Sequence, residues 1–374
     1  MKVFLQAIFG QILLNGYLLW RGQQALPPGK KWRIPFVLLF ILEWALYFTG
    51  YFFHSLLPDG LMIPILHICT TWYIASMYLT MGMVLPELLL LTNRRWKWFP
   101  ETVRKRRQRI KLSLFFLLVA GVTGLMIHAH RQVARPVVTH VYLHIPKTVE
   151  GRDSLTVALM CDMHFGEFVG KKQAQHYVSL CNAQHPDLVL LGGDLIDYES
   201  LIAEALRIEE DLQQLTAPLG VYLTPGNHEY RANRHAKFRW MAKTGGVLLV
   251  DSVAMPDSTF YLVGRDDAIN PKRAALHTLM KDLDMSKPVI VLDHQPVSLN
   301  ETMMNQADLG LHGHTHNGQL WPYRLLLRFV YECVYGYYRK GGTQFYVTSG
   351  IGCAGAPYRV GTRSELVVLH ITFR

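Results

Sequence analysis

The chain has 374 residues, of which 50% are hydrophobic and 18% charged, and its formal net charge is +10. This length allows two or three domains, and so apolar a composition is unusual for a soluble protein. Residues 1–150 hold 17 Lys and Arg against 5 Asp and Glu, so residues 151–374 hold 21 against 23 and are nearly neutral. Because a nucleic-acid-binding domain needs basic clusters on its folded surface, we exclude that class. The five cysteines, odd in number and widely spaced, indicate neither a zinc finger nor a disulfide framework.

Four apolar stretches predict that the N-terminal third, residues 1–130, lies in a membrane. They cover residues 3–20, 35–57, 61–91 and 112–129, and each approaches or exceeds the ~20 residues that a helix needs to cross a bilayer. The first stretch is the weakest, since it contains Gln6, Gln11 and Asn15. It lacks a small-residue cleavage site and further apolar stretches follow, so we interpret it as an anchor rather than a removed signal peptide.

The connections between these stretches predict the orientation. Residues 21–34 contain four Lys and Arg, residues 92–111 contain nine, and the connection at 54–60 contains none. The positive-inside rule places both basic connections in the cytoplasm. With four spans, both termini lie on the far side. We therefore expect a multi-pass protein of the plasma or inner membrane, with its C-terminal domain extracytoplasmic.

Three ionisable residues, Glu43, His67 and Glu87, lie within or at the ends of the apolar stretches. Such residues are functional hypotheses by default, but we favour a role in helix packing. The basic run at 104–111 has a similar pair of explanations, namely binding of anionic headgroups or, as we prefer, determining the topology.

After a linker at 131–153, whose alternating part at 137–145 suggests a strand, the pattern changes to that of an α/β domain covering 154–374. Short apolar runs alternate with amphipathic stretches, and the helices are expected at residues 173–183, 201–215, 233–243 and 272–283. Each of five apolar runs ends in a polar cluster. Because ligands bind at the carboxyl ends of strands in such folds, the clusters are expected to meet at one edge.

Taken singly, each cluster has an ordinary explanation as a turn or a surface histidine. The clusters are Asp162-Met163-His164, Gly193-Asp194 with Asp197, Asn227-His228-Glu229, Asp293-His294, and the alternating His312, His314 and His316. On an extended backbone, residues two apart point the same way, and imidazole is the commonest protein ligand of transition metals. No account based on core packing requires all of these residues together, so a metal site is the better explanation.

The series Asp162-x-His164, Gly193-Asp194-x-x-Asp197, Gly226-Asn227-His228-Glu229, His294 and Gly313-His314-x-His316 resembles, in order and spacing, the motifs of the calcineurin-like metallophosphoesterases. The resemblance covers about residues 155–371, and no motif is missing. It implies an α/β fold, a four-layer α/β/β/α sandwich, here preceded by an all-α bundle of about four transmembrane helices.

The resemblance also implies two divalent metal ions. Asp162, His164 and His316 would hold the first ion. Asn227, His294 and His314 would hold the second, and Asp194 would bridge both. Mixed nitrogen and oxygen ligands suit Mn²⁺, which we expect, with Fe, Zn or Co as alternatives. The family's reaction is hydrolysis of a phosphoester or pyrophosphate bond by a metal-bridging hydroxide.

The family pattern assigns His228 as the group that donates a proton or hydrogen bond to the leaving oxygen, and Asp197 as the carboxylate that orients this imidazole. Glu229 is left open, as a partner of a ligand or of a neighbouring loop. His312 corresponds to no usual ligand, and we assign it to packing or to support of the ligands.

Residues 317–319 resemble a membrane-associated branch of the family, in which several members cleave lipid-linked phosphoesters. The following segment, residues 320–338, is aromatic and apolar with interspersed arginines. It suits an acyl chain and phosphate, a membrane surface, or simple packing onto the domain. We expect the partners to be the bilayer and a phosphorylated small-molecule or lipid-linked substrate. The alternatives are a tethered phosphodiesterase for soluble esters or nucleotides, and a non-catalytic membrane scaffold or sensor. The oligomeric state is not predicted.

Overall fold

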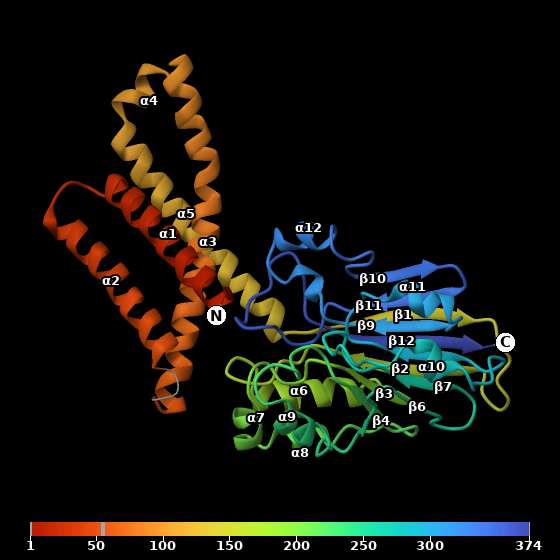
Figure 1. Cartoon of the computed structure of the whole chain (residues 1–374). Helices are drawn as coiled ribbons and strands as arrows, with labels where there is room; N and C mark the ends of the chain where they lie inside the picture. The colour runs from red at the N-terminus through yellow and green to blue at the C-terminus, as the bar shows by residue number, and fades with distance from the viewer. Residues whose placement is uncertain (1, 54–56, 374) are drawn as a thin grey trace. The chain divides into compact units, whose positions relative to one another are not determined.

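The computed structural model describes residues 2–53 and 57–373 (Figure 1). The chain divides into two compact units, Met1–His128 and Ala129–Arg374. The predicted connection at 54–60 lies partly outside the described residues.

The first unit is helical, as its apolar composition predicts. Its elements, the last of which continues into the second unit, are α1 (Lys2–Ala25), α2 (Lys30–Phe52), α3 (Asp59–Trp96), α4 (Glu101–Lys105) and α5 (Arg107–Ala134). In the described part of the chain, three helical segments are long and apolar enough to cross a membrane, namely Lys30–Gly50, Gly60–Trp96 and Arg107–Ala134. The side chains of the first residues of α1 lie outside the described part of the chain, so a fourth span at residues 3–20 is not tested and stays a prediction.

Polar side chains join helices inside this unit. The Asn15 amide donates a hydrogen bond of 2.7 Å to Glu43 Oε2, and the Gln11 amide donates to the other oxygen of the same carboxylate. Glu87 accepts a hydrogen bond of 2.8 Å from the Tyr17 hydroxyl and pairs with Arg21. These contacts favour the packing interpretation of Glu43 and Glu87.

The second unit contains two six-stranded mixed sheets. The first has the order β1-β12-β2-β3-β4-β5 and the second β10-β11-β9-β8-β7-β6. The strands of the first sheet are β1 (Val137–Ile145), β2 (Ser154–Met160), β3 (Leu188–Gly192), β4 (Val221–Thr224), β5 (Val247–Leu248) and β12 (Glu365–Phe373). Those of the second are β6 (Ser252–Ala254), β7 (Tyr261–Gly264), β8 (Val289–Leu292), β9 (Leu309–His312), β10 (Gly336–Lys340) and β11 (Thr343–Val347). The runs β2-β3-β4-β5 and β7-β8-β9-β11 are parallel.

The helices of this unit are short. They are α6 (Lys171–Asn182), α7 (Leu201–Ala205), α8 (Ile208–Leu212), α9 (Arg234–Met241), α10 (Leu276–Met280), α11 (Leu299–Met304), the 3-10 helix η2 (His316–Gly318) and α12 (Tyr323–Leu327). The predicted helix at 201–215 is two helices, because Arg207 between them takes a positive φ of 54° that a helix interior does not allow. The predicted helix at 272–283 is only the five residues of α10.

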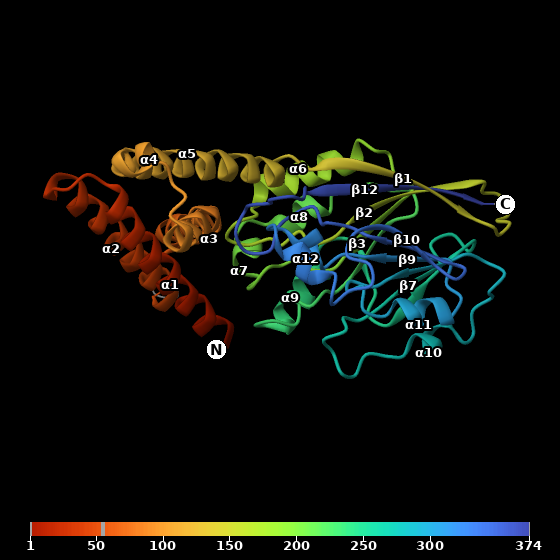
Figure 2. The same ribbon diagram turned by 90° about the horizontal axis from the view of Figure 1, so that it is seen from above.

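The core shows how successive strand residues face opposite sides. Leu159 and Leu190 of the first sheet share a buried cluster with Leu292 of the second. Their neighbours Met160 and Leu191 face the other way, into a cluster with residues of α6, α8 and α9. On the second sheet, residues of β7 and β8 pack with α10. Figure 2 shows α6 on the side of the first sheet, and α10 and α11 on the side of the second. The predicted mixed α/β class is confirmed, and the four-layer order remains an implication of the family resemblance.

Candidate metal centre

The predicted site residues follow the carboxyl ends of five parallel strands. Asp162 and His164 follow β2, Asp194 and Asp197 follow β3, and Asn227 and His228 follow β4. His294 follows β8, and His314 and His316 follow β9. Because parallel strands end at the same edge of a sheet, these segments meet although they are far apart in sequence.

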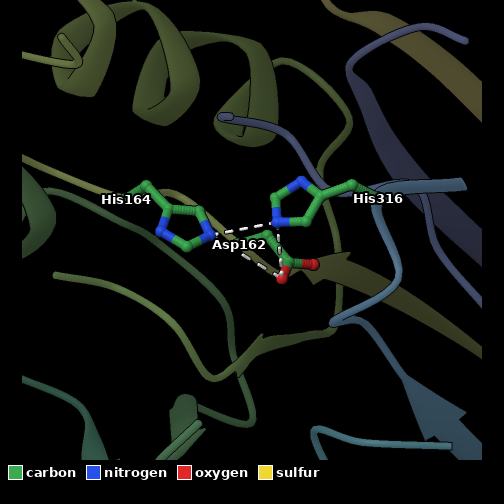
Figure 3. A group of neighbouring side chains, drawn as sticks. All are labelled: Asp162, His164 and His316. Atoms are coloured by element: carbon green, nitrogen blue, oxygen red, sulfur yellow. Dashed lines mark hydrogen bonds and ion pairs between the residues drawn. The ribbon is translucent and has the colours of Figure 1, made fainter. Parts of the chain in front are cut away.

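One group consists of Asp162, His164 and His316 (Figure 3). The Nε2 atoms of His164 and His316 lie 3.0 Å apart, and Asp162 Oδ1 lies 3.4 Å from His316 Nε2 and 4.0 Å from His164 Nε2. All three residues are buried. Figure 3 shows the two imidazoles turned toward each other beside the carboxylate.

A second group consists of Asp194, His294 and His314. His294 Nε2 lies 3.1 Å from Asp194 Oδ2, and Asn227 Oδ1 lies 2.7 Å from His314 Nδ1. Asp194 Oδ2 is also 3.8 Å from His164 Nε2 in the first group. The structure thus brings together all seven residues predicted as metal ligands, with Asp194 between the two groups.

The donor atoms fit a divalent cation. The Nδ1 atom of His294 lies 2.7 Å from the Gly192 carbonyl oxygen, which orients the ring, while its buried Nε2 has no hydrogen-bond partner. A buried polar atom without a partner is costly, and this one points at a carboxylate oxygen. Nitrogen and oxygen donors converging in this way suit Mn, Fe, Zn or Co.

The backbone around these residues is strained and closely packed. Positive φ angles, which are uncommon for residues other than glycine, occur at Asp162 (58°), His164 (51°), Asp194 (52°), His314 (70°) and His316 (49°). A Cβ atom at Gly313 would lie only 2.5 Å from Asp162 Oδ2, so a residue with no side chain is required there. Such strain gathers at functional sites, where the surrounding structure fixes a particular geometry.

The charges of the site are unevenly distributed. Burial and the neighbouring His294 lower the pKa of His314 to about 3, and burial and His164 lower the pKa of His316. These shifts favour neutral imidazoles at His314 and His316, whereas Asp194 and Asp197 raise the pKa of His294 and His164, respectively, against the effect of burial. Burial would raise the pKa of Asp194, but His294 outweighs it and keeps that pKa well below its usual range.

His228 forms a third group of possible metal ligands with His164 and Asp194, and Asp197 lies beside it. Asp197 Oδ1 is 3.1 Å from His228 Nδ1 and equally 3.1 Å from His164 Nδ1. Although burial opposes it, the hydrogen bonds from these two histidines lower the pKa of Asp197. The other ring nitrogen, His228 Nε2, lies 4.0 Å from Asp194 Oδ2 and 2.6 Å from Arg231 Nη1. This geometry allows Asp197 to orient His228, whose catalytic role stays a prediction.

Glu229, left open by the sequence, holds two loops together. Its buried carboxylate accepts hydrogen bonds from four backbone N–H groups, those of Asp194, Leu195, Ile196 and Gly226. His312 lies against the ring of Phe345, and its Nδ1 is 2.7 Å from the Asp293 carbonyl oxygen. Both residues therefore support the site and lie outside the two metal-binding groups.

The structure adds three residues that the sequence analysis missed. The Tyr331 hydroxyl lies 2.9 Å from His314 Nε2, and Arg231 contacts His228. Arg359 is fully buried and donates hydrogen bonds to the carbonyl oxygens of His316, Ser349 and Gly352. Arg231 could have been found from the sequence because it lies three residues after His228, but no motif marks Tyr331 or Arg359.

Comparison with known proteins finds metallophosphoesterases. The family model described as calcineurin-like phosphoesterase matches residues 155–318. A Danio rerio protein named "Transmembrane protein with metallophosphoesterase domain" is 29% identical, and the alignment covers 97% of this chain and 87% of that protein. An "Uncharacterized metallophosphoesterase" of Helicobacter pylori is 31% identical, with 64% of this chain and 65% of that protein covered. This chain thus spans less than two thirds of the bacterial relative.

Two solved structures are more distant. A dimetal phosphatase from Danio rerio has a TM-score of 0.38 and 14% identity, with 60% of this chain and 100% of that chain covered. A putative 5'-nucleotidase from Staphylococcus aureus has a TM-score of 0.38 and 11% identity, with 57% and 54% covered. Similarity at this level says nothing about the substrate of the present chain.

Proposed function

The chain carries a calcineurin-like metallophosphoesterase domain, and from this premise we propose that it is a membrane-anchored hydrolase that cleaves a phosphoester or pyrophosphate bond with two divalent metal ions. Mn²⁺ is the metal we expect, with Fe, Zn or Co as alternatives, because the ligands mix nitrogen and oxygen. We further propose that the substrate is linked to a lipid, and that the bond cleaved is, for example, a phosphodiester.

The observation that carries the proposal is the pair of ligand groups on either side of Asp194. Asp162, His164 and His316 would hold one ion. Asn227, His294 and His314 would hold the other, and the two oxygens of Asp194 suit a bridge. When bound, two such ions activate water and neutralise charge on the phosphoryl group.

The chain's own residues supply the remaining chemistry. Because His228 Nδ1 contacts Asp197, we assign the other ring nitrogen, Nε2, to protonate the leaving oxygen, a role that requires substrate to replace the Arg231 guanidinium at this nitrogen. Arg231, whose guanidinium is 2.6 Å from this nitrogen, is placed to bind a phosphate oxygen beside it.

The domain is proposed to be extracytoplasmic, and this does not depend on α1. Both basic connections, 21–34 and 92–111, are assigned to the cytoplasm by their charge. A single candidate span, Arg107–Ala134, then separates the second connection from the domain. If α1 does not cross the membrane, only the N-terminus changes side.

Two alternatives differ in what the ligand set does. A tethered phosphodiesterase for soluble esters would use the same metal centre with the helices as an anchor only. A non-catalytic scaffold or sensor has no need of the ligands, and the complete set of seven argues against it.

The test replaces Asp194 by asparagine in the full chain, purified with Mn²⁺ in lipid nanodiscs. Loss of the bridging charge should lower both the metal content and the hydrolysis of bis(p-nitrophenyl) phosphate. Mutating a residue that only hydrogen-bonds a metal ligand costs roughly 10–100-fold, and we expect a larger loss here. Asp282→Asn is the matched control, since that side chain is 86% exposed on the same domain. Equal activity in Asp194→Asn and the control would refute the proposed centre.

Incubation with a total lipid extract then addresses the substrate. Mass spectrometry should show selective loss of one phosphorylated lipid class with the unmodified chain and not with Asp194→Asn. Cleavage of the generic ester with no change in any lipid would favour the soluble-substrate alternative.

A further inference from the structure

The segment after the metal-binding residues exposes large apolar side chains. Five of them, on and just after the short helix α12, form what we call the α12 surface: Tyr323 (54% exposed), Leu325 (48%), Leu326 (59%), Phe329 (89%) and Val330 (70%). Figure 1 shows α12 standing apart from the two sheets. Contiguous exposed apolar side chains of this kind mark an interaction site.

Contacts with the rest of the domain hold the backbone of α12 in place. Leu327 is buried, and its carbonyl oxygen accepts the N–H of Tyr331 at 2.9 Å. Gly318 packs so closely against the backbone of α12 that a Cβ atom there would lie 2.5 Å from the backbone nitrogen of Arg324. These contacts fix the backbone of α12, so the apolar side chains of the α12 surface stay exposed.

The charge of the segment is opposite to that of the rest of the domain. Residues 320–340 contain four Lys and Arg and one acidic residue, Glu332. Glu332 is already paired with Lys340 at 2.7 Å, and no described carboxylate lies within ion-pair distance of the exposed Arg328. Residues 151–374 as a whole carry 21 basic and 23 acidic groups. Arg324 and Arg328, beside apolar side chains, suit anionic lipid headgroups.

The α12 surface also borders the metal centre. The Tyr331 hydroxyl, one residue after Val330, lies 2.9 Å from His314 Nε2. Gly318, which packs against Arg324, ends the 3-10 helix that begins at the predicted ligand His316. A molecule lying on the α12 surface is thus within reach of the site.

We propose that the α12 surface lies in the interfacial layer of a bilayer containing anionic lipids, and that the site takes a phosphoester whose apolar part stays in that bilayer. The substrate part of this inference rests on the proposed phosphoesterase function. The bilayer is the fitting occupant because the described part of the chain has three candidate spans and the last of these, ending at Ala134, is followed within three residues by β1. Interfacial segments bury apolar side chains about 5–10 Å into the headgroup and acyl boundary.

The test places a fluorophore on the surface in the full chain, reconstituted in nanodiscs of phosphatidylcholine with phosphatidylglycerol. Phe329→Cys carries an environment-sensitive NBD label, which is selective because all five native cysteines are buried. Lys281→Cys is the control, since that side chain is 65% exposed next to Asp282. We expect lipid nitroxides near the headgroup to quench the label at 329 and aqueous iodide to spare it, with the reverse at 281.

Two results would overturn the proposal. Quenching of the label at 329 by iodide and not by lipid would place the surface in water. Protection from both quenchers would indicate a protein occupant, such as a second copy of the chain. As a further requirement, Arg324→Gln with Arg328→Gln should weaken lipid quenching in anionic nanodiscs, and an unchanged signal would contradict the role of the arginines.

The same nanodiscs separate this inference from the proposed function. Lipid quenching is read without any turnover, and hydrolysis of bis(p-nitrophenyl) phosphate is measured in parallel with Mn²⁺. Hydrolysis without lipid contact refutes the α12 inference alone. Lipid contact without hydrolysis of this ester and without loss of any phosphorylated lipid from the extract refutes the phosphoesterase function and leaves the α12 surface as a membrane contact.

Discussion

Replacing Glu229 by alanine tests whether the metal centre depends on one buried carboxylate. Glu229 is fully buried, and its two oxygens accept hydrogen bonds of 2.7–3.1 Å from the N–H groups of Asp194, Leu195, Ile196 and Gly226. Alanine leaves four buried donors without a partner. At about 1–3 kcal/mol for each such group, the cost lies between roughly 4 and 12 kcal/mol. Even the lower value is a large part of the about 5–15 kcal/mol by which a domain is usually stable.

The assay is hydrogen exchange of the full chain in nanodiscs, followed in peptides that cover residues 188–197. A loss of about 4 kcal/mol corresponds to exchange roughly a thousandfold faster. The strand β12 is the internal reference, since faster exchange there as well would mean global unfolding. Glu210→Ala is the matched control: this side chain is 42% exposed and pairs with Arg207 at the surface, and such pairs contribute about 0–1 kcal/mol. Wild-type exchange at residues 194–196 in Glu229→Ala would refute the reasoning.

Two further predictions concern single side chains. His228→Ala should keep the metal content of the unmodified chain and lower turnover roughly 10²–10⁴-fold, as measured by elemental analysis and initial rates; loss of metal would instead make His228 a ligand. Glu301→Gln should lower stability at pH 7 by roughly 1–3 kcal/mol, because Glu301 accepts hydrogen bonds from Arg265 and the Leu276 N–H. These bonds lower the pKa of Glu301 against the effect of burial. Its contribution is therefore complete above the unfolded value of about 4.3 and is lost as pH falls through the folded value. The urea denaturation midpoints of the unmodified chain and of Glu301→Gln should approach each other toward acid pH. A difference between them that grew there would contradict the prediction.

The sequence predicted which residues the structure brings together at the candidate site, and for a physical reason. Each ligand lies at the end of a short, continuously apolar run, and parallel strands place all such ends at one edge. The extended backbone expected for His314 and His316 is wrong, since both have positive φ angles (70° and 49°) and they belong to different groups, so their assignment as ligands depends on the family resemblance. The helices were less predictable, since Arg207 breaks the expected 201–215 helix through a positive φ that its side chain does not signal.

Residues that shape the site from outside the motifs could not be predicted. Arg359 follows no apolar run, and its role depends on carbonyl groups of two segments, that of His316 after β9 and those of Ser349 and Gly352 in its own connection between β11 and β12. Tyr331 is one of several aromatic residues in its segment, and only the fold shows which hydroxyl reaches His314. Such contacts depend on tertiary geometry, which a pattern along the chain does not encode.

The position of Asp197 links the roles predicted for His164 and His228, which the sequence analysis described separately. The same oxygen, Oδ1, lies 3.1 Å from Nδ1 of the predicted ligand His164 and 3.1 Å from Nδ1 of the predicted proton donor His228. A carboxylate that holds one ring nitrogen fixes which way the other nitrogen points and raises its basicity. The metal binding proposed for His164 and the proton donation proposed for His228 would therefore depend on a shared charge. Removing that charge should disturb both, which distinguishes Asp197 from a residue that only orients the catalytic histidine.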